Sequence, residues 1–336
     1  MRLPLQLVTA AIGLALVVVV LGGWTRLNDA GLGCPDWPGC YGTWVLPDDH
    51  AELAAAHPHA SIDLRKGWIE MVHRYAAGVL GLMVLALAVL AYRLRRQAGY
   101  PVKLSFCLLA LVIAQGIFGM WTVTLQLLPV VVTMHLLGGL ATLTALVLLR
   151  QNLRRLASGN NDVVRSSAHP WVKLMLAALF LQLALGGWTS TNYAGWACSD
   201  WLYCHQDQQV EYDFAQGLNP VMSIGPNYEG GLLPADARAA IQVTHRGGAI
   251  LLLLISLLGA RQLWGKSKLR WPLCIYGVLL LGQIVLGLAN VIWLLPLALA
   301  VAHHVGAVAL LLALLTLNDK ARVAPREVDH GYVVAH

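Results

Sequence analysis

Charged residues are scarce in this chain. Asp, Glu, Lys and Arg make up 12% of its 336 residues, whereas hydrophobic residues make up 58%. A soluble domain carries about 25% charged residues. Because so few charges cannot cover the surface of a water-soluble protein of this size, the composition argues against a soluble enzyme. It predicts an all-α protein that crosses a membrane several times.

Several common functional motifs are also absent. The sequence has no phosphate-binding loop, no Rossmann glycine pattern and no zinc-ribbon spacing. Its net charge of +6 would suit a nucleic acid, but the basic residues lie in loops between apolar segments, so membrane topology explains them and we expect no nucleic-acid partner. The apolar run near the N-terminus has no small-residue cleavage site after it, so we expect a retained helix rather than a signal peptide.

Eight apolar segments are each close to the roughly 20 residues that a bilayer requires. They cover approximately 4–24, 70–92, 104–124, 130–150, 171–189, 240–262, 272–292 and 296–317. Lys and Arg cluster near 93–103, 150–165, 261–270 and 320–326, while the long loops at 25–69 and 190–239 are richer in Asp and Glu. The positive-inside rule therefore predicts cytoplasmic termini and two long outer loops.

The chain contains an internal repeat. Residues 22–40 read GGWTRLNDAGLGCPDWPGC, and residues 186–204 read GGWTSTNYAGWACSDWLYC. Each half then holds four helices in the same orientation, so the halves are related by an axis along the membrane normal. We expect two pseudo-twofold-related four-helix bundles, at 1–155 and 171–318, with a cytoplasmic linker at 156–170 and a cytoplasmic tail at 319–336.

A histidine lies near the outer start of every second apolar segment. The four are His73, His135, His245 and His303. Each half would thus direct two histidines from similar depth into a shared interior, which is the arrangement that a six-coordinate heme iron requires. Arg74 and Arg246 directly follow two of them and are candidates for pairing with heme propionates.

Other interpretations of these histidines stay open. A single histidine inside a membrane often forms a polar helix contact or part of a proton path. Zinc or copper also binds imidazole, usually with cysteine or carboxylate partners in a tighter cluster. His304 would be an alternative to its neighbour His303, although the repeated His-x-x-Gly spacing favours His303. Four histidines at matched depth favour heme.

Glu70 distinguishes the two halves. It lies three residues before His73, and the equivalent position before His245 is Gln242. A carboxylate takes up and releases protons at working pH, whereas an amide of similar shape does not. This difference predicts that the N-terminal half performs chemistry. The alternative is that Glu70 stabilises the start of a helix, where negative charge is favourable.

Two cysteine pairs lie in the outer loops. They are Cys34 with Cys40 and Cys198 with Cys204. Both pairs are on the oxidising side, where disulfides persist. We interpret the second pair as a structural link, and for the first pair a redox-active role remains open. The remaining two, Cys107 and Cys274, fall within apolar segments and are interpreted as packing residues.

The first outer loop, the Glu70-x-x-His73-Arg74 element and the duplicated plan resemble the heme A synthase family of bacteria and mitochondria, over nearly the whole chain. The resemblance implies an oxidoreductase of the membrane that converts the C8 methyl of heme O to the formyl of heme A by successive hydroxylations. Heme A is the cofactor of terminal cytochrome oxidases. It also implies partnership with heme O synthase and oxidase assembly factors, in a bacterial inner membrane.

The resemblance further implies roles for individual residues. His73 and His135 would face the substrate heme O, His245 and His303 would ligate a resident heme b, Glu70 would be the catalytic carboxylate, and Cys34–Cys40 would be the outer-loop disulfide. The second outer loop is unusually long at about 205–239. Whether it caps the resident heme or forms a partner surface is open, as is homo-oligomerisation.

Functions of other classes compete with this one. A di-heme b cytochrome that passes electrons from a quinol would suit the four histidines equally well, but it does not explain the Glu70/Gln242 difference. A thiol–disulfide oxidoreductase would use the cysteine pairs and a quinone. A transporter would suit the duplication, although no helix is clearly interrupted at mid-membrane.

Overall fold

A computed structural model describes residues 1–46, 53, 62–159, 169–198, 200, 204 and 211–322. Every named element in this part of the chain is a helix. They are α1 (Arg2–Leu27), α3 (Leu64–Arg93), α4 (Val102–Thr124), α5 (Pro129–Ala157), α6 (Pro170–Thr191), η2 (Ala194–Trp196), α7 (Phe214–Gly217), α8 (Ala235–Leu263), α9 (Ser267–Ile292) and α10 (Leu297–Lys320). The all-α prediction is confirmed for the described residues.

Eight of these helices are long and apolar enough to cross a membrane, one for each predicted segment. Some extend beyond the apolar sequence, because hydropathy does not report polar end turns. Helix α3 begins at Leu64, where the side chain of Asp63 accepts a hydrogen bond from the backbone N–H of Lys66 at 3.0 Å. The structure is that of a multi-pass membrane protein.

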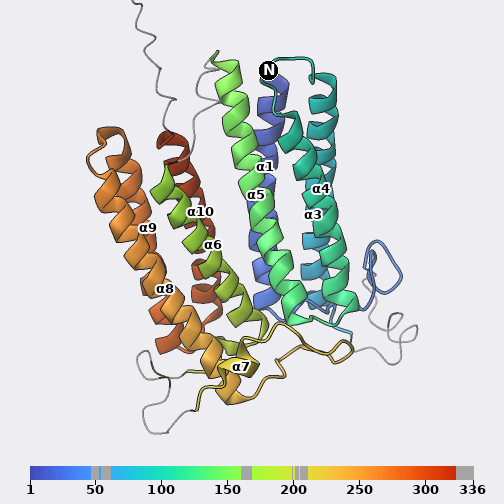
Figure 1. The fold of residues 1–336 in the computed structure, drawn as a ribbon. Helices are drawn as coiled ribbons and strands as arrows, with labels where there is room; N and C mark the ends of the chain where they lie inside the picture. The colour runs from blue at the N-terminus through green and yellow to red at the C-terminus, as the bar shows by residue number, and fades with distance from the viewer. Residues whose placement is uncertain are drawn as a thin grey trace, which may run out of the picture.

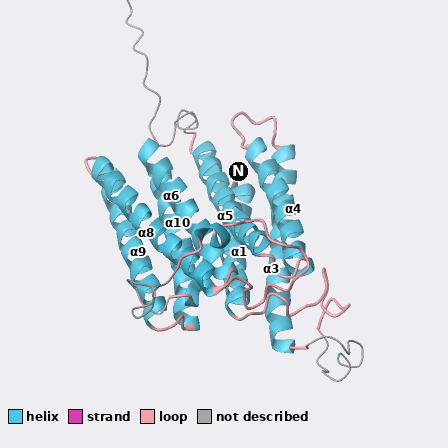
Figure 2. Cartoon of the chain, turned by 60° about the horizontal axis from the view of Figure 1, so that its bottom comes forward, coloured by secondary structure: helices cyan, strands magenta, loops and turns pink. Residues whose placement is uncertain are grey.

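The long helices contact one another in two rings of four. In the first ring α1 contacts α3, α3 contacts α4, α4 contacts α5, and α5 returns to α1. In the second ring the order is α6, α8, α9 and α10. The rings lie side by side in Figures 1 and 2. They meet where α5 packs on α6 and α10 packs on α1.

Leucine-rich packing joins the two rings, and the outer surface is left apolar. The main buried cluster includes Leu146 and Leu149 of α5 together with Leu311 and Leu314 of α10. Large apolar side chains such as Leu82 are exposed on the outside of the rings, as lipid contact requires. Cys107 and Cys274 are also exposed, so they do not pack against neighbouring helices as expected.

The long loop between α6 and α8 crosses to the first ring of helices. We call residues 218–231, which follow α7, the strap; they run beneath α5 in Figure 1. Tyr228 packs against Leu127, Leu128 and Val131 around the start of α5, and its backbone N–H donates to the carbonyl of Gln126 at 3.0 Å. Two side chains add an ion pair, Lys66 with Glu229 at 3.3 Å. This part of the loop therefore covers the end of the first ring at which α5 begins.

We expect Tyr228→Ala to release the strap. The ring is 5% exposed and its hydroxyl donates to the carbonyl of Ser223 at 2.6 Å. Losing a buried aromatic side chain costs about 3 kcal/mol, so limited proteolysis should cut the strap faster. Ile224→Ala is the control, because Ile224 is 73% exposed. Equal cleavage of the two variants would contradict this role of Tyr228.

Candidate functional site

Each of the four candidate histidines contacts a glycine on the neighbouring helix. A Cβ built on the glycine would lie close to Cε1 of the ring in every case. The pairs are Gly22 with His73 at 3.0 Å, Gly119 with His135 at 3.3 Å, Gly186 with His245 at 3.2 Å, and Gly287 with His303 at 3.3 Å. These separations are at or below ordinary van der Waals contact. Glycine therefore lets each ring enter between two closely packed helices.

The first histidine pair has a separation that suits one metal ion. The ring centroids of His73 and His135 lie 6.5 Å apart, and their planes are nearly perpendicular at 82°. A metal–imidazole nitrogen bond is about 2 Å long and the ring centroid lies about 1.2 Å further, so two rings on opposite sides of one ion have centroids about 6.4 Å apart. Within the described residues, Nδ1 of both rings is buried without a full hydrogen bond. This pair fits a bis-imidazole heme iron.

Glutamine side chains brace both histidines of the second pair. Gln182 approaches Nδ1 of His245 at 3.1 Å and donates to the carbonyl of His245 at 3.1 Å, while Gln283 donates to the carbonyl of His303 at 2.7 Å. The second histidine pair is thus held by two side-chain amides. Such contacts around a ligand fix the orientation of its ring.

The brace depends on a further set of glycines. A Cβ on Gly138, Gly248 or Gly306 would collide with the side chain of Gln115, Gln182 or Gln283 respectively. Around the fourth histidine, His73, the residues equivalent to the glutamine and the glycine are Val18 and Ala76. There the carbonyl of Val18 faces the His73 ring, outside full hydrogen-bond geometry. Of the four histidines, His73 alone therefore has no glutamine at the position that Gln115, Gln182 and Gln283 occupy beside the others.

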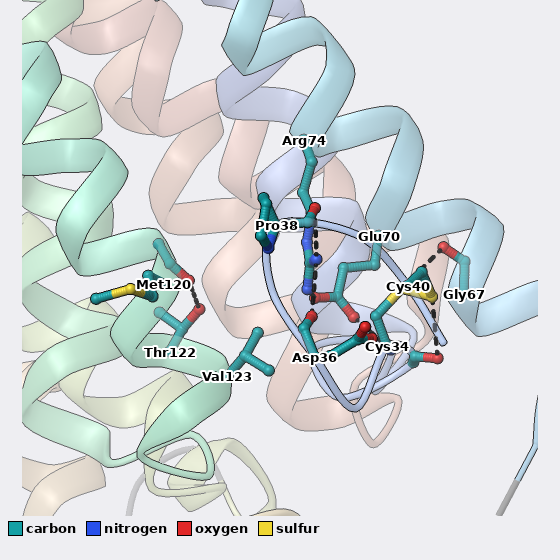
Figure 3. Close-up of polar contacts among 12 residues, drawn as sticks. Cys34, Asp36, Pro38, Cys40, Gly67, Glu70, Arg74, Met120, Thr122 and Val123 are labelled. Atoms are coloured by element: carbon teal, nitrogen blue, oxygen red, sulfur yellow. Dashed lines mark hydrogen bonds and ion pairs between the residues drawn. A yellow bond between two sulfur atoms is a disulfide. The ribbon is translucent and has the colours of Figure 1, made fainter. Parts of the chain in front are cut away.

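Glu70 connects α3 to the first cysteine loop. Its side chain is 5% exposed, and Oε2 accepts a hydrogen bond from the backbone N–H of Cys34 at 2.9 Å. Oε1 accepts from Arg74 in a buried ion pair. Arg74 also donates to the carbonyl of Asp36 at 3.0 Å, as Figure 3 shows. It donates to the carbonyl of Gly39 at 2.6 Å as well. Glu70 therefore does more than stabilise the start of a helix.

The cysteine loop itself is compact. Cys34 and Cys40 form a disulfide of 2.01 Å, and both are buried. The loop lies so close to α3 that a Cβ on Gly33 would fall 2.6 Å from the carbonyl oxygen of Lys66. Burial raises the pKa of Tyr41, with the charge of Asp63 among the further causes, so this phenol stays neutral at physiological pH.

The second half repeats the arginine contact, with Gln242 in the place of Glu70. Arg246 donates to the carbonyl of Asp200 at 3.0 Å, which is the repeat counterpart of the Arg74–Asp36 bond. Cys198 and Cys204 are bonded at 2.08 Å. Gln242 occupies the place of Glu70 and is equally buried. Because both arginines face loop carbonyls, their pairing with propionates stays a prediction.

His304 faces away from the second histidine pair. Its Nε2 lies 3.0 Å from the carbonyl oxygen of Val19 in α1. That contact crosses from the second ring of helices to the first. His303, whose ring lies against Gly287, is therefore the member of this neighbouring pair that shares an interior with His245.

Comparison with known proteins places this duplicated site in a family. The sequence model of the COX15-CtaA family, described as cytochrome oxidase assembly protein, matches residues 6–315. The chain belongs to the COX15-CtaA family. The match covers both rings of helices, all four histidines and both disulfides.

Individual COX15-CtaA relatives are similar over almost their full lengths. The chain is 41% identical to heme A synthase of Shewanella oneidensis, over 90% of this chain and 92% of the relative. It is 28% identical to heme A synthase of Rhizorhabdus wittichii, over 93% of this chain and 92% of the relative. The similarity to the Caulobacter sp. enzyme of the same name is also 28%, over 92% and 93%.

We expect Gly287→Ala to disturb heme binding at His303. The new Cβ would lie 3.3 Å from the ring, so the imidazole or the helix must shift by a few tenths of an ångström. The heme-to-protein ratio and the low-spin absorption spectrum of the purified protein measure the effect. Gly282→Ala on the same helix is the control, because a Cβ there meets nothing within 4 Å. Equal heme retention in both variants would contradict the ring–glycine contact.

We expect Glu70→Gln to loosen the first cysteine loop. The amide can keep the bond from Cys34, but it removes the negative charge that faces Arg74. Arg74 keeps its bonds to the loop carbonyls but loses a charge-assisted hydrogen bond, which contributes about 1.5–3 kcal/mol. Cys34 should therefore become easier to reduce and alkylate. Cys198 in the same molecule is the internal control. Unchanged labelling of Cys34 would show that the ion pair does not hold the loop.

Proposed function

We propose that this protein is a heme A synthase, which oxidises the C8 methyl of heme O to the formyl group of heme A for cytochrome oxidase biogenesis. The observation that carries the proposal is the 41% identity to a heme A synthase over 90% of the chain. The ring–glycine contacts of the four histidines support it, because two histidines from each ring of helices would suit a bis-imidazole heme.

The proposed architecture is two pseudo-twofold-related four-helix bundles with cytoplasmic termini in the bacterial inner membrane. Residues 1–155 form the N-terminal bundle, 156–170 the linker, 171–318 the C-terminal bundle and 319–336 the tail. The two rings of helix contacts support this division. The start of α1 and the end of α10 lie at the same end of the helices in Figure 1, as cytoplasmic termini require.

The two histidine pairs take different roles in the proposal. His73 and His135 hold the substrate heme O, and His245 and His303 hold a resident heme b. Bound there, heme b would supply one-electron transfer. The amide contacts from Gln182 and Gln283 suit a permanently held group. Beside His73 the equivalent position holds Val18 instead of a glutamine. A less firmly held histidine suits a heme that must leave after the reaction.

Glu70 is the proposed proton-transfer group. Turning a methyl group and one water into a formyl group releases four protons and four electrons, and an external one-electron acceptor would have to take up the electrons. Those protons must leave a buried site, so a titratable side chain near His73 is needed. Glu70 lies on the same face of α3 as His73, about one turn away. Its bonds to Cys34 and Arg74 hold the carboxylate in a defined position.

The buried Cys34–Cys40 disulfide is assigned a structural role in this mechanism. Both sulfurs are shielded from solvent, and disulfide exchange requires access to a sulfur. The loop places the backbone N–H of Cys34 on the Glu70 carboxylate. Heme O synthase would supply the substrate, and oxidase assembly factors would receive the product.

Heme extraction from cells that make heme O tests the function. Cells that also make this protein should contain heme A, and His73→Ala should abolish it. Glu70→Gln should lower heme A formation by about 100-fold, as loss of a general acid–base group does. Recovery of heme b and unconverted heme O from the wild-type protein would instead favour the electron-transfer cytochrome.

A matched variant separates the chemistry of Glu70 from its support of the loop. Arg74→Gln breaks the same ion pair and the loop contacts but keeps the carboxylate. We expect Arg74→Gln to retain more activity than Glu70→Gln. If both variants lost activity equally and both exposed Cys34 to reductant, the role of Glu70 would be structural.

A further inference from the structure

His304 lies where the second ring of helices meets the first. It follows His303 in α10, and its Nε2 donates a hydrogen bond to the carbonyl of Val19 in α1 at 3.0 Å. The carbonyl can only accept, so the ring proton is on Nε2. The imidazole also packs on Gly23, where a Cβ would fall 2.6 Å from Nε2. The His304 side chain thus packs where the absence of a Cβ on Gly23 leaves room for it.

The repeat builds the same contact with a different side chain. Leu136 follows His135 just as His304 follows His303, and its Cδ2 would lie 3.1 Å from a Cβ on Gly187. Gly187 is the repeat counterpart of Gly23. Both halves therefore press a side chain against a glycine of the other half. Only His304 adds a hydrogen bond, so packing alone does not require a histidine there.

The α1 turn that receives His304 also supports His73. The carbonyl of Val18 faces the His73 ring, and a Cβ on Gly22 would lie 3.0 Å from that ring. The adjacent residues Val19 and Gly23 contact His304 on a neighbouring face of α1. One helical turn is thus held between the two imidazoles. His73 is the histidine without a glutamine brace, so the turn itself positions it.

We propose that His304 is a positioning residue that couples the two histidine pairs. Its hydrogen bond fixes the α1 turn against His73, and its place next to His303 links that turn to the helix of the resident heme. Occupancy of the second pair then helps to set the geometry of the first. The proposal rests on the assignment of the pairs to hemes under the proposed function, and it does not require the oxidation step.

The test uses the full-length protein purified from cells that lack heme O. Heme O is titrated into wild type, His304→Leu and His304→Gln, and the dissociation constant and low-spin spectrum are recorded. His73→Ala measures how much heme O binds outside the first histidine pair, and the spectrum of the resident heme b reports folding. Net loss of one hydrogen bond corresponds to about three- to tenfold weaker binding. We expect this loss in His304→Leu, with recovery in His304→Gln, whose amide can donate to Val19.

Leu136→Ala is the matched control at the equivalent contact. It removes a packing contact that carries no hydrogen bond, so it should lower the melting temperature without the weakening and glutamine rescue of heme O binding that are expected at His304. If His304→Leu changed only the melting temperature, the coupling role would be wrong. If heme O bound with the expected differences but was never oxidised in cells, the proposed function would fail while the coupling stood.

Discussion

The structure depends on an imidazole ring resting against a helix that carries no side chain at that point. Four glycines provide this contact for four histidines, two in each ring of helices. A larger residue would force the helices apart or turn the ring away, because protein interiors are packed without spare volume. The duplicated sequence thus keeps two enclosed histidine pairs. The functional distinction between them lies in the residues around each pair.

Three differences between the halves concern the first pair or its supports. Glu70 stands in place of Gln242, Val18 in place of Gln182, and Leu136 in place of His304. The first adds a titratable group beside His73, and the second removes a brace from the same histidine. The third gives the second ring a histidine, His304, which bonds to the α1 turn beside His73. The strap also runs from the C-terminal half onto the N-terminal half. Under the proposed function, these differences separate a pair that binds the substrate heme from a pair that holds a resident heme.

Much of this was predictable from the sequence, because hydropathy and the 164-residue repeat each carry a strong signal. The eight helices are confirmed, as is membership of the family. The four histidines are placed against glycines, while their iron ligation stays a prediction. The GGW repeat contains Gly22 and Gly186, but only coordinates show that the glycines receive imidazoles. The Gln182 brace and the path of the strap depend on contacts between distant segments, which no local pattern encodes.

The central claim is that the two pairs hold different hemes, and pigment analysis of ligand variants tests it most directly. The protein is purified from cells that make heme b but no heme O, and heme b is quantified per chain. We predict that His245→Ala and His303→Ala lose the resident heme b, whereas His73→Ala and His135→Ala retain it. Equal loss of heme b from all four variants would contradict the account, because the two pairs would then be equivalent sites.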